Sequence, residues 1–254
     1  MNPPRPLFRQ LFEPVSSTYT YLLACPETRE AVLVDPVMPA WQRDLQAVNE
    51  LGLQLVMTID THIHADHITS ASLLRREVGS RIALPALDAL PCTDVPIEEG
   101  KPLQVGGVRI DPMHTPGHTD NHFALVAGDR VFTGDALLID GCGRTDFQSG
   151  DARALYGSVR GKLFALPDET LVYPAHDYKG RWVSSIAQER QRNPRLGAGQ
   201  TLEAFVELMA NLDLPYPKFI DYAVPGNRQC GQCPPDLPAR LREYCPEMAE
   251  SPQG

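Results

Sequence analysis

The chain has 254 residues, 43% of them hydrophobic and 22% charged, which is the balance of an ordinary globular protein with a full hydrophobic core. Its formal net charge of -9 argues against the basic surface that nucleic-acid binding requires. No apolar run approaches the roughly 20 residues of a membrane span, and residues 1–14 lack the apolar centre of a secretory signal, so we expect a cytoplasmic protein without membrane contact.

The first third of the chain predicts a hairpin, a helix, a buried strand and a second helix. Apolar runs at 19–24 and 31–34, split by a turn-like Pro-Glu-Thr, predict the hairpin. Apolar residues recur at helical spacing over 41–51. Residues 53–59 form a continuous apolar run of strand length, and a second helical pattern covers 71–78. The buried strand leads directly into a histidine-rich loop.

The remainder of the chain alternates strands and helices and then becomes irregular. Asp151 and Thr201 are predicted to begin helices as N-caps. From about residue 213 the chain is rich in proline and predicts an irregular tail. We therefore expect one mixed α/β domain over residues 1–254, with polar motifs at the strand ends. Further strands are expected at 105–110, 123–127, 131–133 and 171–173.

The six cysteines are unevenly spaced, and in a chain of this length they do not indicate a disulfide framework. Cys230 and Cys233 form a CxxC pair, which could be redox-active or could bind zinc with a third thiol such as Cys245. Because the pair stands alone in a proline-rich tail, we interpret it as two unrelated thiols.

Histidines carry the strongest functional signal. His62, His64, Asp66 and His67 stand within six residues, directly after the predicted buried strand. Residues two apart in an extended loop point the same way, so His62 and His64 could face one ion. Asp66 could instead only cap the helix expected near residue 68. Three imidazoles and a carboxylate suit zinc, iron or manganese, so the pattern predicts a metal site.

Four segments in order, THIHADH, TPGHT, FTGDALL and YPAHDY, resemble the metallo-β-lactamase superfamily from about residue 21 to 225. The resemblance implies a four-layer αββα sandwich of two mixed sheets. Longer stretches, among them THIHADHITSASLLR, TGDALLIDGCGRTDFQSGDARALY, NPRL and DYAVPGN, are similar to the persulfide dioxygenase (sulfur dioxygenase) family.

Ligand counting and the family resemblance lead to different metal centres. By count, the chain has donors for two ions, with His176 and a bridging Asp135 completing the set, as in glyoxalase II hydrolases. The persulfide dioxygenase resemblance instead implies one Fe(II) per chain, held by His62, His118 and Asp135 in a 2-His-1-carboxylate triad. His64, Asp66, His67 and His176 then orient ligands and water, or hold a second metal.

The resemblance also implies the reaction and its substrate. Open positions on Fe(II) would receive a persulfide anion and O₂, giving sulfite and free glutathione, with no catalytic residue beyond the metal ligands. Arg144, Tyr178 and Arg195 are the expected glutathione-binding residues, because glutathione carries two carboxylates. Each has a structural alternative, such as an ion pair of Arg144 with Asp146 or Asp177.

The resemblance leaves partners and alternatives open. Some family members are fused to a rhodanese domain, and we expect none here, so a sulfur-transfer partner would be a separate chain. Self-association is a further expectation. The alternative functions are a glyoxalase II-like dinuclear zinc thiolester hydrolase and a non-catalytic metal-binding sensor.

Overall fold

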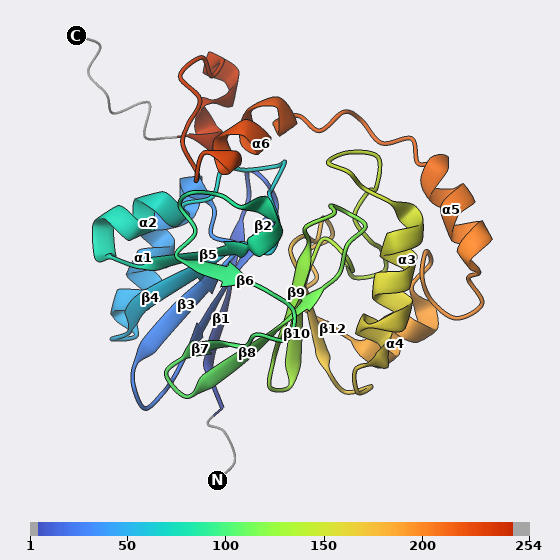
Figure 1. The fold of residues 1–254 in the computed structure, drawn as a ribbon, viewed down its shortest axis with the longest axis horizontal. Helices are drawn as coiled ribbons and strands as arrows, with labels where there is room; N and C mark the ends of the chain where they lie inside the picture. Colours follow the sequence, from blue (N-terminus) through green and yellow to red (C-terminus); the bar gives the residue numbers. More distant parts are fainter. Residues whose placement is uncertain (1–4, 246–254) are drawn as a thin grey trace. The chain divides into compact units, whose positions relative to one another are not determined.

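The computed structural model describes residues 5–245, which form two compact units. The first contains the described residues up to Pro96, residues 105–108, and the described residues from Tyr216 onward. The second contains residues 97–104 and 109–215. Each unit is built around one six-stranded sheet of mixed strand direction (Figure 1). The expected tail beyond residue 245 lies outside the described residues.

The first sheet follows chain order from β1 to β6. β1, β2 and β3 are antiparallel, which confirms the predicted hairpin of β2 and β3, and β4 and β5 continue the sheet in parallel. β4 is parallel to both of its neighbours, and the loop with the histidines follows its carboxyl end. Functional sites of such sheets lie at the carboxyl ends of the parallel strands. The strands are β1 (Leu7–Glu13), β2 (Thr18–Ala24), β3 (Glu30–Val34), β4 (Gln54–Ile59), β5 (Arg81–Pro85) and β6 (Val95–Ile97).

Two predicted helices, α1 (Trp41–Glu50) and α2 (Ala71–Val78), pack on this sheet. Val48 of α1 and Leu74 of α2 share one buried cluster with residues of β2, β3 and β4. The N-cap of α2 is Ser70, so the capping alternative for Asp66 is wrong. Short 3-10 helices lie at Met38–Ala40 and Ala86–Asp88.

The tail is more ordered than the sequence predicted. Residues Ile220–Arg228 form helix α6, with Pro225 inside it, and Ala239–Tyr244 form a 3-10 helix. Phe219, Ala223 and Leu241 are buried in one cluster with Met38 and Ile68. This burial compensates for the helix-breaking tendency of proline, which local sequence alone cannot reveal.

The interpretation of the tail cysteines as unrelated thiols is also wrong. Disulfides join Cys92 to Cys230 and Cys233 to Cys245. The two CxxC residues therefore pair with different partners, the first of them 138 residues away in sequence. Pairing at that separation depends on tertiary contact and cannot be deduced from spacing.

The second sheet has the order β12-β11-β10-β9-β8-β7. β10 and β11 pair in parallel. The pairs β8–β9, β9–β10 and β11–β12 are antiparallel. The single strand predicted at 105–110 is wrong, because Gly106, at a φ of +54°, turns the chain between β7 and β8. The strands are β7 (Leu103–Val105), β8 (Val108–His114), β9 (Phe123–Ala127), β10 (Arg130–Gly134), β11 (Leu171–Pro174) and β12 (Ser184–Ser185).

Helices α3 (Ala152–Gly161), α4 (Ile186–Arg192) and α5 (Leu202–Ala210) complete the second unit, with a 3-10 helix at Leu163–Ala165. The predicted N-caps are confirmed: the side chains of Asp151 and Thr201 accept hydrogen bonds from backbone N–H groups in the first turns of α3 and α5. None of the helices within residues 5–245 has the length and apolarity needed to cross a membrane.

Candidate metal centre

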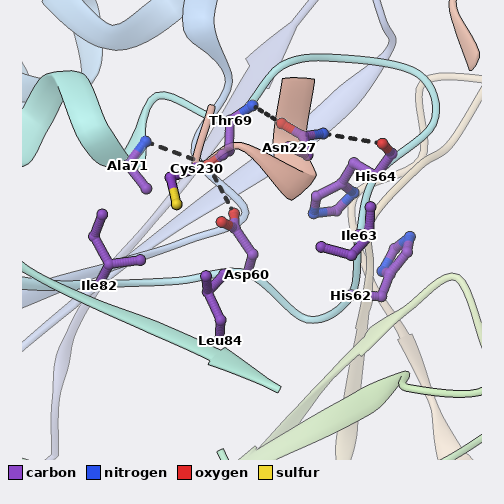
Figure 2. A pocket seen from close by; sticks show the side chains of 10 residues that line it. All are labelled: Asp60, His62, Ile63, His64, Thr69, Ala71, Ile82, Leu84, Asn227 and Cys230. Carbon is purple, nitrogen blue, oxygen red and sulfur yellow. Dashed lines mark hydrogen bonds between the residues drawn. The ribbon is translucent and has the colours of Figure 1, made fainter. Parts of the chain in front are cut away.

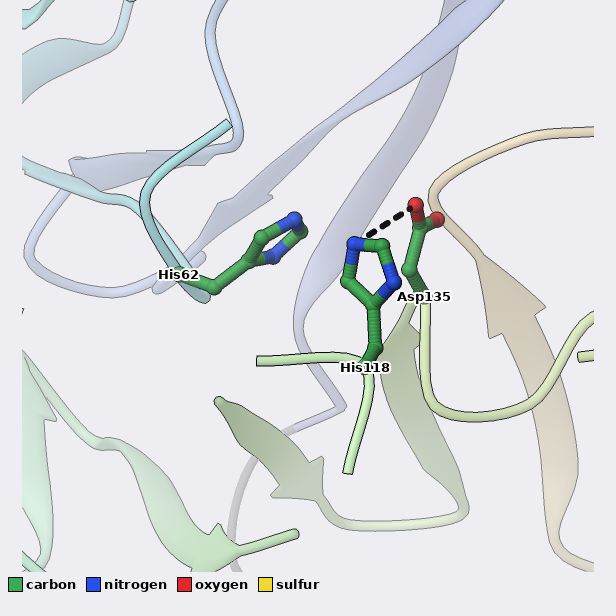
Figure 3. A group of neighbouring side chains, drawn as sticks. All are labelled: His62, His118 and Asp135. Atoms are coloured by element: carbon green, nitrogen blue, oxygen red, sulfur yellow. Dashed lines mark ion pairs between the residues drawn. The ribbon is translucent and has the colours of Figure 1, made fainter. Parts of the chain in front are cut away.

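Asp135 lies between two imidazole nitrogens in the second unit. It follows β10 directly, and His176 follows the neighbouring parallel strand β11, so both side chains lie at the same sheet edge. Asp135 Oδ2 lies 3.4 Å from Nε2 of His118, the contact drawn in Figure 3. Asp135 Oδ1 lies 3.6 Å from Nε2 of His176. The carboxylate thus faces one nitrogen with each oxygen.

The 3.4 Å distance between His118 and Asp135 fits a shared metal better than it fits a hydrogen bond. Donor atoms bound to one ion at about 2.1 Å lie about 3.0–3.4 Å from one another. Asp135 Oδ1 is buried, and no residue in the range 5–245 donates a hydrogen bond to it. A buried carboxylate oxygen without a donor is unfavourable unless a cation compensates for its charge. The donors therefore fit a metal ion.

The orientation of His118 also suits metal binding. Its Nδ1 lies 2.8 Å from the carbonyl oxygen of Arg144, which can only accept a hydrogen bond. The proton of the neutral ring therefore sits on Nδ1, and the lone pair sits on Nε2, the atom that faces Asp135. Such a hydrogen bond to the far nitrogen is the usual support of a metal-binding histidine.

His122 and Gly143 hold Asp135 in place. Nε2 of buried His122 accepts the backbone N–H of Asp135 at 3.1 Å, and its Nδ1 contacts the hydroxyl of Thr115 at 2.8 Å. Gly143 donates its N–H to the carbonyl oxygen of Asp135 at 2.8 Å. A Cβ at Gly143 would lie 2.5 Å from that oxygen and 2.9 Å from Nδ1 of His118, so a larger residue would displace both groups.

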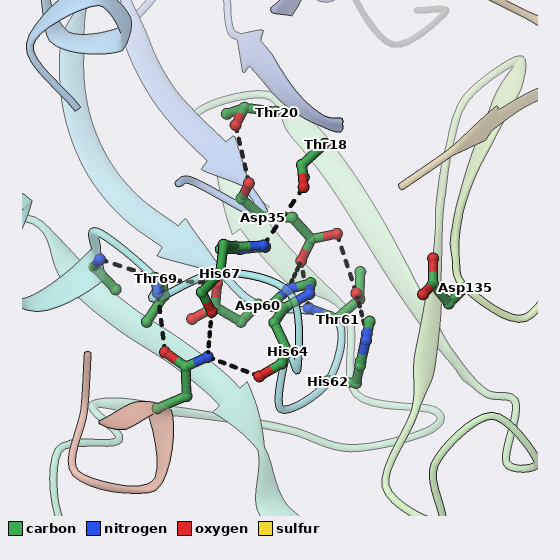
Figure 4. A network of polar contacts seen from close by, with 12 residues as sticks. Thr18, Thr20, Asp35, Asp60, Thr61, His62, His64, His67, Thr69 and Asp135 are labelled. Carbon is green, nitrogen blue, oxygen red and sulfur yellow. Dashed lines mark hydrogen bonds and ion pairs between the residues drawn. The ribbon is translucent and has the colours of Figure 1, made fainter. Parts of the chain in front are cut away.

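His62 occupies the loop after β4 in the first unit and is 1% exposed. Its Nδ1 lies 3.0 Å from the hydroxyl of Thr61, which donates its own proton to Oδ2 of Asp35 at 3.0 Å (Figure 4). The hydroxyl is therefore left to accept from His62, and this places the proton on Nδ1 and the lone pair on Nε2. His62 thus has the same tautomer as His118.

Asp35 organises the loop that carries His62. Its Oδ1 accepts the backbone N–H of Thr61 at 2.7 Å and contacts Nε2 of His64 at 3.0 Å. Asp35 has a φ of +50°, an unfavourable value for a residue with a side chain, and its buried contacts hold it there. Burial disfavours the charged imidazole, but attraction to Asp35 and a hydrogen bond with it outweigh this effect and raise the pKa of His64 to about 9.

The remaining predicted donors of this loop form a second group. His64, Asp66 and His67 each offer one potential ligand atom, and these three atoms lie within 4.8 Å of one another. Nδ1 of His67 lies 2.9 Å from Oδ2 of Asp66, an oxygen that also accepts the hydroxyl of Thr18 at 3.0 Å. The structure thus brings these predicted residues together, and their donor types also suit a metal ion.

Comparison with known proteins places the chain in a family. Residues 14–176 match the model of the metallo-beta-lactamase superfamily. The chain is 50% identical over 228 residues to the mitochondrial persulfide dioxygenase ETHE1 of Homo sapiens, covering 89% of each protein. The chain belongs to the persulfide dioxygenase family of the metallo-β-lactamase superfamily.

Two further comparisons concern a solved structure of the same family and a relative with a different name. The crystal structure of ETHE1 from Myxococcus xanthus has 53% sequence identity and a TM-score of 0.87, covering 89% of this chain and 100% of that one. A probable hydroxyacylglutathione hydrolase of Schizosaccharomyces pombe is 36% identical over 169 residues, or 63% of this chain and 64% of that protein. The two mixed sheets with their helices confirm the predicted metallo-β-lactamase fold. The superfamily fold and the His and Asp donors identify a metal-binding protein.

In this persulfide dioxygenase family member, the three predicted substrate residues have different surroundings. The guanidinium of Arg144 forms two 2.7 Å hydrogen bonds with Asp146 and one of 2.8 Å with the carbonyl oxygen of Pro215. Arg195 donates to the carbonyl oxygen of Cys142 at 2.8 Å. Tyr178 is 75% exposed and stacks on His176 with ring centroids 5.9 Å apart. Of the three residues, only Tyr178 is mostly exposed to solvent.

Asp35 and His122 are the site residues that the sequence reasoning missed. Asp35 directly follows β3, which pairs with β4 in parallel, so its place at the same strand edge as His62 was the signal. His122 stands four residues after His118 in a histidine-rich segment. The sequence there does not distinguish a histidine that binds a metal from one that orients a ligand. The supporting role of His122 follows only from the contact with Asp135.

Proposed function

We propose that this chain is a persulfide dioxygenase that oxidises glutathione persulfide with O₂ at one Fe(II) ion. One persulfide, one O₂ and one water give one glutathione, one sulfite and two protons. The observation that carries the proposal is 50% identity to a persulfide dioxygenase over 89% of both chains. The pair of His118 and Asp135, with donor atoms 3.4 Å apart, supports a metal within that family.

We assign His62, His118 and Asp135 as the ligands. Support comes from the matching tautomers of the two histidines and from the buried, donor-free Oδ1 of Asp135 among residues 5–245. These two imidazoles and one carboxylate would hold Fe(II), which when bound would supply the redox chemistry between a persulfide anion and O₂. Arg144 and Asp35 keep the ligands oriented, through a carbonyl oxygen and through the hydroxyl of Thr61 respectively. His64, Asp66, His67 and His176 are assigned to support.

The substrate assignment follows the chemistry of glutathione. Tyr178 offers an exposed ring and hydroxyl beside His176. Arg144 and Arg195 offer cations for the two carboxylates, although both also hold protein groups. A single functional domain, a cytoplasmic location, self-association and a separate rhodanese partner stay predictions.

A dinuclear zinc thiolester hydrolase is the second candidate, because the donors of His64, Asp66 and His67 within 4.8 Å of one another could hold a second ion. Elemental analysis combined with two assays separates the candidates. We expect about one iron per chain, with oxygen uptake and sulfite release on adding glutathione persulfide. Two zinc ions with turnover of S-lactoylglutathione would establish the hydrolase, and bound metal without either activity would favour a sensor.

Asp135→Ala tests the ligand assignment within the same experiment. The variant should lose the metal and the oxygen uptake together, because removal of a ligand leaves two imidazoles without the carboxylate charge. Asp129→Ala, an exposed residue of the same unit that pairs with Arg130, serves as the matched control and should retain both. Oxygen uptake that persists in Asp135→Ala would refute the assignment.

A further inference from the structure

Asn227, near the end of α6, makes three hydrogen bonds to the loop that carries the histidines. Asn227 is 4% exposed. Its Nδ2 donates to the carbonyl oxygens of His64 at 2.9 Å and His67 at 2.8 Å. Its Oδ1 accepts the backbone N–H of Thr69 at 2.9 Å, and Figure 2 shows the bonds to Thr69 and His64. One amide from the tail thus satisfies three backbone groups of a loop about 160 residues away in sequence.

The backbone around Asn227 lies directly against the same loop. A Cβ at Gly226 would lie 2.6 Å from Cδ1 of Ile68, and a Cβ at Gly231 would lie 2.5 Å from the carbonyl oxygen of Thr69. The hydroxyl of Ser72 donates to the carbonyl oxygen of Cys230. At Gly231 only glycine permits the approach, because the atom that it meets belongs to the backbone of Thr69, so the packing there is specific to this pair of segments.

The tail belongs to the first unit and is anchored within it. Ala223 of α6 is buried in the cluster that contains Ile68, and Cys230 is joined to Cys92 by a disulfide. A small cavity of about 10 Å³, room for about one water, is lined by Asp60, His64 and Asn227 among others (Figure 2). Asn227 therefore lies between a fixed element and a loop that has no regular structure from residue 60 to 68.

We propose that Asn227 is a positioning residue that holds the loop of His62 in its metal-binding conformation. The carbonyl oxygens of His64 and His67 and the amide of Thr69 lie in a loop without regular secondary structure. The side-chain amide of Asn227 forms a hydrogen bond with each of these three backbone groups. The inference rests on the proposed assignment of His62 as a ligand. It gives the DYAVPGN segment a function in the site, although that segment contains no ligand.

Asn227→Asp is the sharpest test because it keeps size and the acceptor for Thr69 while it removes both donor hydrogens. A carboxylate oxygen would then face two carbonyl oxygens. We expect the dissociation constant for Fe(II), and for Zn(II) as a second probe, to rise about 10- to 100-fold in chelator competition. Hydrogen exchange of the metal-free protein should become faster for amides of residues 61–70.

Two further variants separate positioning from a general loss of stability. Leu163→Ala opens a cavity in the core of the other unit and should lower the unfolding temperature without altering metal affinity or exchange in residues 61–70. Ser72→Ala removes only the bond to Cys230 and should change both readouts in the same direction as Asn227→Asp, but less, which covers the case that Asn227→Asp does not fold.

The two readouts also separate this inference from the proposed function. Wild-type protein that binds neither metal contradicts the proposed function, while faster loop exchange in the metal-free variant would still support positioning by Asn227. Wild-type metal affinity together with unchanged exchange in Asn227→Asp would overturn the inference, as would equal losses of affinity in Leu163→Ala.

Discussion

The backbone of Arg144 orients His118, accepting its Nδ1 proton at 2.8 Å, while the guanidinium of the same residue binds Asp146. Backbone and side chain thus act separately, and a substitution of the side chain leaves the contact with His118 in place. This separation allows substrate binding to be tested apart from metal binding.

Arg144→Gln is expected to raise the KM for glutathione persulfide about tenfold, or about 1.4 kcal/mol, with unchanged metal content. The reason is the loss of a cation for a glutathione carboxylate. Steady-state oxygen uptake measures the effect. Asp146→Asn is the matched control, because it weakens the ion pair but keeps the guanidinium. Equal defects in both variants would indicate that Arg144 is only a structural partner of Asp146.

Gly143→Ala is expected to weaken metal binding about 10- to 100-fold, because the new methyl group would lie 2.5 Å from the carbonyl oxygen of Asp135. Gly157→Ala, in the exposed middle of α3, has no atom within 4 Å of the added Cβ and should stabilise the protein by about 0.5–1 kcal/mol. Metal titration and thermal unfolding of both variants measure the contrast. Normal metal affinity in Gly143→Ala would show that the close packing is not needed.

His122→Leu should lower the free energy of unfolding by about 1–3 kcal/mol, because the half-buried N–H of Asp135 loses its acceptor. Metal affinity should fall with it. His122→Gln provides a carbonyl oxygen as a replacement acceptor and should recover part of both losses. Denaturant unfolding and chelator competition provide the measurements, and a Gln variant no better than Leu would contradict the role assigned to His122.

The disulfides predict a simple labelling result. Under denaturing, non-reducing conditions an alkylating reagent should modify two of the six cysteines, Cys25 and Cys142. Reduction of the disulfide between Cys92 and Cys230, which are 138 residues apart in sequence, should lower the free energy of unfolding by about 2–5 kcal/mol. Peptide mass spectrometry identifies the labelled residues. Labelling of Cys92 or Cys230 without reductant would contradict the pairing.

Asp44 predicts a pH dependence of stability. Its burial, opposed by attraction to Arg43, raises its pKa to about 6. The folded state therefore holds the proton more tightly than the unfolded chain, and the contribution of Asp44, present below about pH 4, is lost as pH rises through 6. Asp44→Asn should gain up to about 3 kcal/mol relative to wild type between pH 4 and 7. Unfolding curves across that range measure the gain, and a constant difference would refute the shift.

The sequence by itself determined which residues are candidate metal donors and most of the elements around them. The apolar run of β4, which ends at Ile59 shortly before His62, and the N-caps Asp151 and Thr201 are local signals, because each depends on neighbours within a few residues. The family resemblance followed from the same local segments and was confirmed by the relatives.

Tertiary structure alone decided what supports those donors. Three kinds of contact join residues whose separation in sequence follows no helix or strand periodicity. They are the disulfide of Cys92 with Cys230, the hydrogen bond of His122 with Asp135 and the three hydrogen bonds of Asn227. Proline in α6 predicted irregular chain, but burial against Ile68 and its neighbours outweighed that preference. Hydrogen bonds and packing between distant segments depend on the folded path of the backbone, which local propensity does not specify.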